Sequence, residues 1–416
     1  MNVILTPSKL RGEIEAIPSK SMAHRLLICA ALSDGTTKVR CNGTSEDIEA
    51  TISCLKAMGS NILRIGDSYL VPKITVGACD AVSFNCGESG TTLRFMMCIA
   101  AGIGLRAKFD GSDRLFERPL EPLIKVLKDH GIVISRDERN RIIQSGKAFL
   151  PDYEIEGNIS SQYISGLMLM LPLCGGGRVK VTGSFESKPY VTLTMKALQE
   201  SGVKASEEDN TYSVYGKYAL SNTDVEGDWS NAGFFLVASA LGSDVTVKGL
   251  DVNSSQGDRE TLCVLEKFGC ENLVENGVKV RAKELKAQTI DVSDIPDAVP
   301  ILSVLASVSK GETHILGAKR LRLKESDRLL TVANMINNLG GDAEIVDDSL
   351  VIRGKDFLAG GRVEAEKDHR IAMSAAIAST VSKGEVEIIG AEAVNKSYPK
   401  FFEDLVSLGA HIERRQ

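Results

Sequence analysis

The chain has 416 residues and a formal charge of −6 at pH 7. One hydrophobic core rarely serves a chain of this length, so two or three domains are expected. The net negative charge disfavours a nucleic-acid-binding protein, and an anionic ligand must therefore be held by a local basic site.

Cysteines, histidines and apolar stretches restrict the chemistry further. The nine cysteines include no Cys-x-x-Cys pair, which is typical of a reducing compartment. The five histidines lie far apart, so we expect neither a structural nor a catalytic metal. The N-terminal segment has no basic leader, and the longest apolar stretch, residues 164–174, is too short to span a bilayer. We therefore expect a cytoplasmic protein that binds neither membrane nor nucleic acid.

A helix that ends in Leu-x-x-x-Gly, once with isoleucine in place of leucine, recurs along the chain with a period of roughly 70 residues. Its six copies are Leu55 to Gly59, Leu127 to Gly131, Leu198 to Gly202, Leu265 to Gly269, Ile336 to Gly340 and Leu405 to Gly409. A short β-type run bounded by glycines recurs in phase, at residues 35–43, 104–111, 177–183, 242–249, 311–317 and 384–390. Alternating apolar residues predict that these runs are half-buried strands. The pattern predicts an α/β or α+β repeat packed as two globules of three units each.

The first helix of every unit is expected to open with a polar cluster. These openings are residues 19–21, 88–92, 160–162, 228–231, 294–297 and 368–370. Small hydroxyl and acidic residues there are ordinary N-caps. Lys20, Arg25, Arg94 and Arg370 need another explanation, because a cation is mildly unfavourable at the positive end of a helix dipole. We interpret them as partners of an anion bound with backbone N–H groups, in a site between the two globules.

Four loops in equivalent places of the repeat also carry cations. They contain Arg118, Lys188, Lys324 with Arg328, and Lys396. Any one of these side chains is more often a solvated surface charge, but their phase with the repeat favours a common basic site.

Two carboxylates stand among these cations. Asp297 precedes the apolar run 298–305 and would by itself be an N-cap, whereas Glu325, between Lys324 and Arg328, would be a surface ion-pair partner. In a basic cleft the same two side chains are candidates for a general base and a general acid. Sequence spacing alone does not decide between these interpretations.

Nine motifs, in order and over essentially the full chain, resemble the EPSP synthase (3-phosphoshikimate 1-carboxyvinyltransferase) family. They are PSKSMAHR (18–25), CGESGTTLR (86–94), GSDRLFERPL (111–120), SSQYISGL (160–167), SKPYVTLT (187–194), IPDAVP (295–300), RLKESDR (322–328), DHRIAMS (368–374) and NKSYPKF (395–401). The resemblance implies two globular domains, each of three βαβαββ copies with helices running parallel toward the interdomain cleft. It assigns residues 18–226 to one domain, and residues 1–17 with 227–416 to the other.

The resemblance also implies the reaction. The family transfers the enolpyruvyl group of phosphoenolpyruvate to the 5-hydroxyl of shikimate 3-phosphate through a tetrahedral intermediate, and it releases phosphate. This step of the shikimate pathway precedes chorismate in aromatic amino-acid biosynthesis and uses no cofactor. Both substrates carry a phosphate and a carboxylate, which accounts for the many cations. A monomer is expected.

The expected site follows residue by residue from the resemblance. Phosphoenolpyruvate contacts are expected from Lys20, Gly90, Arg118, Gln162, Arg328, Arg370 and Lys396. Shikimate 3-phosphate contacts are expected from Lys20, Ser21, Arg25, Ser160, Ser161, Gln162, Ser187, Asp297 and Lys324, with Tyr190 close by. Asp297 corresponds to the acceptor of the hydroxyl proton, Glu325 to the group that exchanges protons with the methylene carbon, and Lys20 to an assisting acid.

Two positions depart from the family pattern. Glu88 stands where many relatives have asparagine, and Arg320 stands where some have asparagine. A negative charge beside Gly90 bears directly on anion binding, so Glu88 is not among the expected contacts.

Three alternatives to this function remain. The enolpyruvyl transferase that acts on UDP-N-acetylglucosamine shares the fold, but it usually has a reactive cysteine near the Arg118 segment, which lacks one here. A non-catalytic anion-binding module would not need Lys20, Asp297, Glu325 and Arg370 together. A glycosidase built on the two carboxylates would leave the surrounding cations unexplained.

Overall fold

The computed structural model describes residues 1–149 and 151–415. The chain divides into two compact units, which we call unit 1 (Met1–Ile17 and Glu226–Gln416) and unit 2 (Pro18–Val225). This division places Glu226 in unit 1, one residue earlier than the expected boundary.

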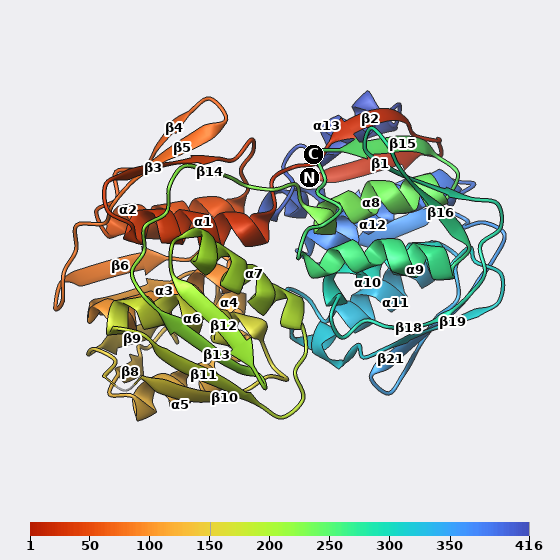
Figure 1. The fold of residues 1–416 in the computed structure, drawn as a ribbon. Coiled ribbons are helices and arrows are strands. Elements are labelled where there is room, and N and C mark those ends of the chain that lie inside the picture. The colour runs from red at the N-terminus through yellow and green to blue at the C-terminus, as the bar shows by residue number, and fades with distance from the viewer. Residues whose placement is uncertain (150, 416) are drawn as a thin grey trace. The chain divides into compact units, whose positions relative to one another are not determined.

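Unit 2 contains three copies of a βαβαββ arrangement (Figure 1). The first copy comprises β14 (Thr223–Asp224), α1 (Lys20–Leu32), β3 (Thr36–Arg40), α2 (Glu46–Ala57), β4 (Leu63–Ile65) and β5 (Ser68–Pro72). The second comprises β6 (Ala81–Asn85), α3 (Gly90–Ile103), β7 (Arg106–Asp110), α4 (Asp113–Glu117), α5 (Glu121–Asp129), β8 (Val133–Arg136) and β9 (Ile142–Ser145). The third comprises β10 (Asp152–Glu156), α6 (Ser161–Met170), the 3-10 helix η1 (Leu171–Cys174), β11 (Gly177–Thr182), α7 (Lys188–Glu200), β12 (Lys204–Glu208) and β13 (Thr211–Tyr215).

Unit 1 repeats the arrangement three times more. The fourth copy comprises β2 (Arg11–Glu15), α8 (Trp229–Ala240), β15 (Asp244–Lys248), η2 (Gly257–Glu260), α9 (Thr261–Lys267), β16 (Cys270–Val274) and β17 (Val278–Ala282). The fifth comprises β18 (Thr289–Asp291), η3 (Pro296–Ala298), α10 (Val299–Ala306), β19 (Glu312–Leu316), η4 (Lys319–Leu323), α11 (Arg328–Asn338), β20 (Ala343–Val346) and β21 (Ser349–Arg353). The sixth comprises β22 (Gly361–Glu364), α12 (His369–Ala378), η5 (Ser379–Val381), β23 (Val386–Ile389), η6 (Ala391–Lys396), α13 (Phe401–Ser407), β24 (His411–Arg415) and β1 (Asn2–Thr6).

The described strands form six four-stranded sheets of one topology, such as β6-β7-β9-β8 and β18-β19-β21-β20. In each of these two examples the first two strands are parallel and have a buried helix between them in sequence, and the remaining pairs are antiparallel. The mixed α/β class and the sixfold βαβαββ repeat predicted from the sequence are confirmed.

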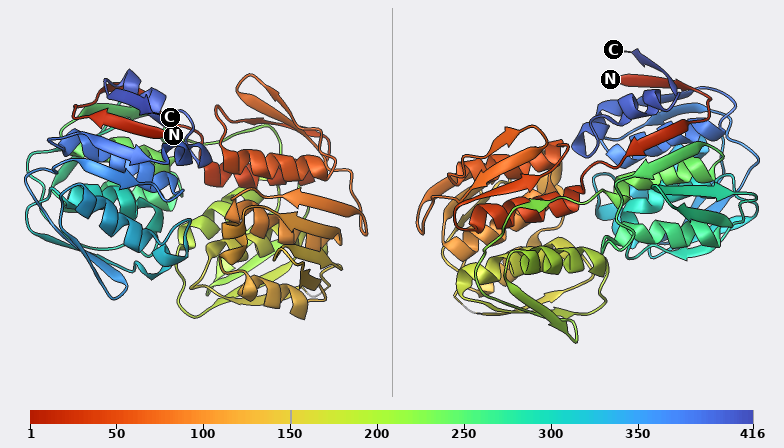
Figure 2. Two further views of the ribbon diagram at one scale, coloured as in Figure 1. Left: turned by 180° about the vertical axis from the view of Figure 1, so that it is seen from behind. Right: turned by 45° about the horizontal axis from the view of Figure 1, so that its top comes forward.

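Three strands complete repeats to which they are not adjacent in sequence. β1 pairs antiparallel with β23 and β24, β2 pairs parallel with β15, and β14 pairs parallel with β3. In Figure 1, β1 and β2 are the red strands among the green and blue elements of unit 1. Figure 2 shows the two ends of the chain close together, on the sheet that β1 shares with β24. The first 17 residues therefore belong to the fold of unit 1.

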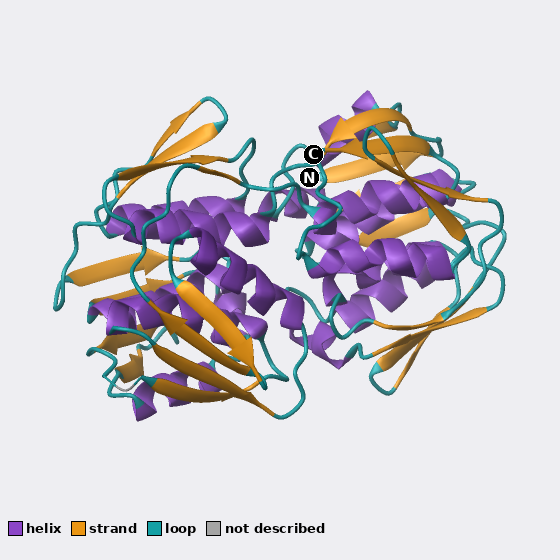
Figure 3. Ribbon diagram, viewed as in Figure 1, coloured by secondary structure: helices purple, strands orange, loops and turns teal. Residues whose placement is uncertain are grey.

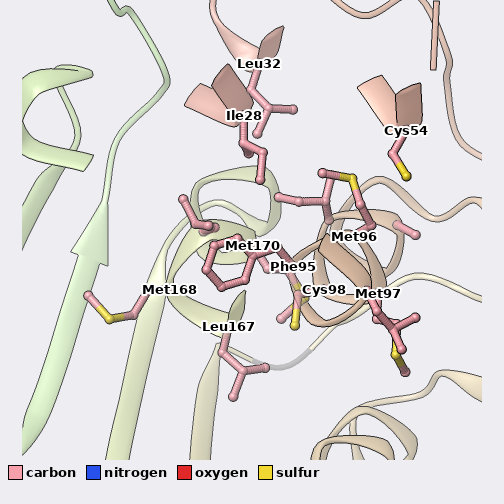
Figure 4. Close-up of a cluster of buried hydrophobic side chains, with 14 of the residues drawn as sticks. Ile28, Leu32, Cys54, Phe95, Met96, Met97, Cys98, Leu167, Met168 and Met170 are labelled. Carbon is pink, nitrogen blue, oxygen red and sulfur yellow. The ribbon is translucent and has the colours of Figure 1, made fainter. Parts of the chain in front are cut away.

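Helices α1, α3 and α6 of unit 2, and α8, α10 and α12 of unit 1, occupy the interior, and the sheets lie outside them (Figure 3). Helices α1, α3 and α6 are buried over nearly their whole length, because apolar or small residues occupy all their faces. Helix α6 approaches α3 so closely that a Cβ on Gly166 would lie 2.8 Å from Cys98 Sγ. Figure 4 shows the packed core of unit 2, where Phe95, Met96 and Met168 lie among other apolar side chains. No helix in the described ranges is long and apolar enough to cross a membrane.

Candidate active site

Five of the six polar openings contain an N-cap, as the sequence predicts, but the opening at residues 294–297 does not, because neither η3 nor α10 has a side-chain cap and Asp297 contacts cations instead. Ser19, Ser89, Ser160, Asp228 and Asp368 each accept a hydrogen bond from a backbone N–H in the first turn of the following helix. The expected site residues fall into two groups, one in each unit, and several of them lie at the capped helix N-termini. We call the group in unit 2 the Lys20 cluster; it comprises Lys20, Ser21, Arg25, Gly90, Arg118, Ser160, Ser161, Gln162 and Ser187. We call the group in unit 1 the Arg328 cluster; it comprises Asp297, Lys324, Glu325, Arg328, Arg370 and Lys396, together with Asp368, which Arg328 contacts.

The Lys20 ammonium forms an ion pair with a residue that the sequence did not single out. Lys20 Nζ lies 2.8 Å from Asp47 Oδ2, and both side chains are largely buried. Asp47 is one of three acidic residues in the first turn of α2, where a carboxylate is favoured by the helix dipole. Nothing in that pattern distinguishes it from a solvated helix-start residue.

Arg25 is buried and connects α1 to α7 through hydrogen bonds. Its Nε donates to Thr194 Oγ1 at 2.7 Å, Nη2 donates to the carbonyl of Tyr190 at 2.9 Å, and Nη1 donates to the carbonyl of Ser21 at 2.5 Å. Burial lowers the pKa of Arg25 to about 10, which still leaves the group charged at neutral pH. The guanidinium therefore fixes the backbone next to Ser21 and Tyr190.

Ser187 precedes α7 in a left-handed backbone conformation with φ 56°. Its side chain does not cap the helix. The hydroxyl thus lies at the start of α7 without taking the usual N-cap role.

Two guanidinium groups lie over the first turn of α3. A Cβ on Gly90 would lie 2.5 Å from Arg94 Nη1 and 2.9 Å from Arg118 Nη1. Arg94 Nη1 donates to Gln162 Oε1 at 2.5 Å, and Gln162 Nε2 donates to Thr91 Oγ1 at 2.8 Å. Two arginines and the N–H groups of a helix N-terminus form a suitable place for a phosphate or carboxylate.

Gln162 connects this group to α6, whose first turn also carries the expected contacts Ser160 and Ser161. Ser160 caps the helix through its hydroxyl, and Ser161 begins the helix and is buried. The contacts expected in unit 2 therefore lie at the N-terminal ends of α1, α3, α6 and α7, with Arg118 at the end of α4.

The Arg328 guanidinium, whose side chain is 1% exposed, contacts three carboxylates. Its Nη1 lies 2.6 Å from Asp297 Oδ1, Nη2 lies 2.7 Å from Glu325 Oε2, and Nε lies 2.7 Å from Asp368 Oδ2. These partners come from η3, the segment before α11, and the N-cap of α12. Arg328 therefore joins its own segment, which includes Glu325, to two segments that are distant in sequence.

Asp297 is surrounded by cations. Besides Arg328, Lys324 Nζ lies 3.1 Å from Oδ1 and Arg370 Nη2 lies 3.6 Å from Oδ2. Burial alone would raise the pKa of Asp297, but Lys324, Arg370 and Arg328 together hold this pKa well below its usual value. Without a ligand, Asp297 is thus a firmly ionised and weakly basic carboxylate.

Glu325 lies between Arg328 and a second cation, because Lys396 Nζ is 3.8 Å from Glu325 Oε1. Lys396 ends η6 and is buried. Lys324, the cation that contacts Asp297, is buried, and burial lowers its pKa although the nearby Asp297 opposes this effect. The cluster brings together all the residues that the sequence predicted for unit 1.

Asp368 is the residue of this cluster that sequence reasoning interpreted only as an N-cap. It is fully buried, caps α12 through the N–H of Arg370 at 3.0 Å, and accepts from Arg328 and, at 3.0 Å, from the Ser326 hydroxyl. Arg370 also donates to the Ser230 hydroxyl at 2.6 Å, at the start of α8. The DHR motif gave no signal that Asp368 also holds an arginine from another helix.

Cations exceed carboxylates by one in the Arg328 cluster, where Lys324, Arg328, Arg370 and Lys396 face three carboxylates. Within the described residues, no group of three or more histidine, cysteine, aspartate and glutamate side chains is placed to hold a metal ion. The cluster is suited to an anionic ligand with a carboxylate base beside it.

The chain is similar to EPSP synthases over its whole length. The family model for EPSP synthase (3-phosphoshikimate 1-carboxyvinyltransferase) matches residues 4–405. A 3-phosphoshikimate 1-carboxyvinyltransferase of Clostridium perfringens (strain 13 / Type A) is 40% identical over 417 residues, which cover 98% of each chain. The enzyme of the same name from Clostridium kluyveri is 39% identical and covers 99% of this chain and 98% of its own. The solved structure of EPSP synthase from Acinetobacter baumannii matches with a TM-score of 0.80 and 25% identity, over 99% of this chain and 100% of that chain.

Proposed function

This chain belongs to the EPSP synthase family, and on that premise we propose that the Lys20 and Arg328 clusters together bind its two substrates and carry out enolpyruvyl transfer. The enzyme transfers the enolpyruvyl group of phosphoenolpyruvate to the 5-hydroxyl of shikimate 3-phosphate, giving 5-enolpyruvylshikimate 3-phosphate and phosphate. The observation that carries the site assignment is the position of Asp297 among Lys324, Arg328 and Arg370. In this proposal the two units correspond to the two domains of the family. We also propose that the protein is a monomer and that it is located in the cytoplasm.

The proposed phosphoenolpyruvate contacts come from both the Lys20 cluster and the Arg328 cluster. They are Lys20, Gly90, Arg118, Gln162, Arg328, Arg370 and Lys396. Arginine forks bind carboxylate and phosphate oxygens in pairs, which orients a small dianion as well as holding it. The proposed shikimate 3-phosphate contacts are Lys20, Ser21, Arg25, Ser160, Ser161, Gln162, Ser187, Asp297 and Lys324.

In the proposed mechanism, Asp297 accepts the proton of the attacking 5-hydroxyl. Glu325 exchanges a proton with the methylene carbon, and Lys20 assists as an acid. The anionic groups of the substrates compete with Asp297 for Lys324 and Arg328, which weakens their hold on the carboxylate and raises its basicity. Positioning of the two substrates and stabilisation of charge supply most of the rate.

The assignment is tested by phosphate release from phosphoenolpyruvate. We expect release only when shikimate 3-phosphate is also present, because the hydroxyl of the acceptor must attack before phosphate leaves. The measurement is a continuous phosphate assay with each substrate alone and with both. Release with UDP-N-acetylglucosamine as the acceptor, and none with shikimate 3-phosphate, would assign the sister reaction instead.

Gly90→Ala is expected to raise KM for phosphoenolpyruvate on the order of tenfold, because a displacement of about 1 Å in a positioning group already impairs catalysis strongly. The added methyl group would displace the flexible ends of Arg94 and Arg118 rather than backbone, so stability should change little. The measurement is steady-state kinetics with each substrate varied in turn.

Gly233→Ala is the matched control for this substitution. Gly233 lies within α8, and a Cβ there would meet nothing within 4 Å. It should leave both KM values unchanged. An unaltered KM for phosphoenolpyruvate in Gly90→Ala would remove Gly90 and Arg118 from the proposed contacts.

A further inference from the structure

A chain of neutral polar side chains runs through the buried interior of unit 2. His24 Nδ1 lies 2.7 Å from Thr51 Oγ1, and Thr51 Oγ1 lies 2.7 Å from Thr92 Oγ1. Thr92 Oγ1 in turn donates to Ser89 Oγ at 2.8 Å. All four side chains are completely buried. The chain links α1, α2 and the N-cap of α3.

This hydrogen-bond chain begins and ends close in sequence to Lys20 and Gly90, two residues proposed to bind phosphoenolpyruvate. His24 lies four residues after Lys20, and Thr51 lies four residues after Asp47, so each is one helical turn further into the protein on the same helix face. An ionic contact and a neutral contact thus join α1 to α2 at successive turns. At the other end of this hydrogen-bond chain, Ser89 directly precedes Gly90 in sequence.

The protons of this chain can be counted. A hydroxyl has one hydrogen to donate, and Thr92 donates its own to Ser89. Thr92 therefore accepts from Thr51, whose single proton is then used, so Thr51 accepts from His24. This count places a proton on His24 Nδ1.

The other tautomer is less favourable for a second reason. Within the described residues, His24 Nε2 has no hydrogen-bond partner. A proton on Nε2 would leave a buried N–H donor without an acceptor, whereas a proton on Nδ1 leaves only an unused lone pair. Burial lowers the pKa of His24 to about 3, although Asp47 opposes this effect, so the ring is neutral at ordinary pH.

We propose that His24 is a positioning residue: its Nδ1–H begins a directed hydrogen-bond chain that fixes the starts of α1, α2 and α3 and so holds Lys20 and Gly90 in register for phosphoenolpyruvate. The inference rests on the proposed function for what these two residues bind. It does not rest on it for the tautomer or for the direction of the chain.

Substitutions at His24 test the position of the donor. The amide nitrogen of His24→Asn reaches the place of Nδ1, so kcat/KM for phosphoenolpyruvate should stay close to that of the unsubstituted enzyme. The amide of His24→Gln reaches the place of Nε2, and His24→Leu has no donor. For these two variants we expect a fall in kcat/KM on the order of tenfold, mainly through KM for phosphoenolpyruvate, as one lost buried hydrogen bond allows.

The second position in the chain supplies an independent pair of variants. Thr51→Ser keeps the hydroxyl and should behave as the unsubstituted enzyme, whereas Thr51→Val should resemble His24→Leu. His314→Gln, at a partly exposed histidine, is the control for a general effect of histidine replacement. Equal losses in His24→Asn and His24→Gln, or losses that follow only the melting temperature, would overturn the positioning role.

Nuclear magnetic resonance of protein labelled with ¹⁵N-histidine tests the tautomer without any assay of activity. The His24 signals are those that disappear in His24→Asn. We expect the neutral Nδ1–H pattern, unchanged from mildly acidic to mildly alkaline pH. An Nε2–H pattern or a protonated ring would overturn the inference, whereas an enzyme without turnover on shikimate 3-phosphate would overturn the proposed function and leave this result standing.

Discussion

Asp297→Asn is expected to lower kcat by about 10²–10⁴-fold, the usual contribution of general acid–base catalysis. The amide cannot accept the proton of the attacking hydroxyl, yet it keeps the shape of the carboxylate and its place among Lys324, Arg328 and Arg370. Affinity for shikimate 3-phosphate should therefore change far less than turnover. The measurements are steady-state kinetics and calorimetric titration with shikimate 3-phosphate.

Asp291→Asn is the matched control, because Asp291 ends β18 six residues earlier and its carboxylate accepts a hydrogen bond from the Ser293 N–H at 2.9 Å. This variant should keep the turnover of the unsubstituted enzyme. A turnover number of Asp297→Asn equal to that of the control would remove Asp297 from the catalytic residues. A loss of shikimate 3-phosphate affinity as large as the loss of turnover would instead assign it a purely binding role.

The repeat was predictable from the sequence because short local patterns of glycine and apolar residues mark each copy. Each copy ends a helix with glycine and flanks a strand with glycines, so periodicity alone defines six copies. The partners of the short terminal strands were not available in this way. β1 and β14 complete sheets whose other strands are far away in sequence, and only tertiary pairing with β23 and β3 reveals it.

Lys20 and Arg370 were predictable because a helix start disfavours a cation, whereas Arg118, Lys324 and Lys396 were predictable because their loops occupy equivalent places in the repeat. Two of their carboxylate partners, Asp47 and Asp368, were not predictable, since they occur where a helix start favours an acidic residue. A residue that fits its local position leaves no anomaly in the sequence, even when it also binds a cation from another helix. Arg25 was predicted as a substrate contact, but the sequence did not show that its guanidinium also joins α1 to α7. Its hydrogen bonds to Thr194 and to the Tyr190 carbonyl reveal that second role.

Arg328→Met is expected to lower the unfolding free energy of unit 1 by about 3–5 kcal/mol, the usual result of removing one partner of a buried ion pair. Asp368 is fully buried and would lose its cation, while Asp297 and Glu325 would lose one of theirs. Trp229 is the single tryptophan of the chain and lies buried in α8 of unit 1. Its fluorescence during urea unfolding reports the stability of that unit. Phosphoenolpyruvate binding should be lost as well.

Arg353→Met is the control, because Arg353 also contacts three carboxylates, Glu312, Asp342 and Glu344, but at an exposed position. Water already solvates those groups, so this variant should cost about 1 kcal/mol or less. Equal losses in the two variants would show that burial does not govern the strength of the Arg328 contacts.

The double variant Arg328→Met with Asp368→Asn separates the lost attraction from the penalty of a stranded charge. Asparagine keeps a side-chain oxygen to cap α12 but carries no charge. If the penalty dominates, the double variant is more stable than Arg328→Met alone, although it has lost more native groups. If the double variant is instead less stable by the full cost of both changes, the two residues act independently. The bond at 2.7 Å between them would then contribute little to unit 1.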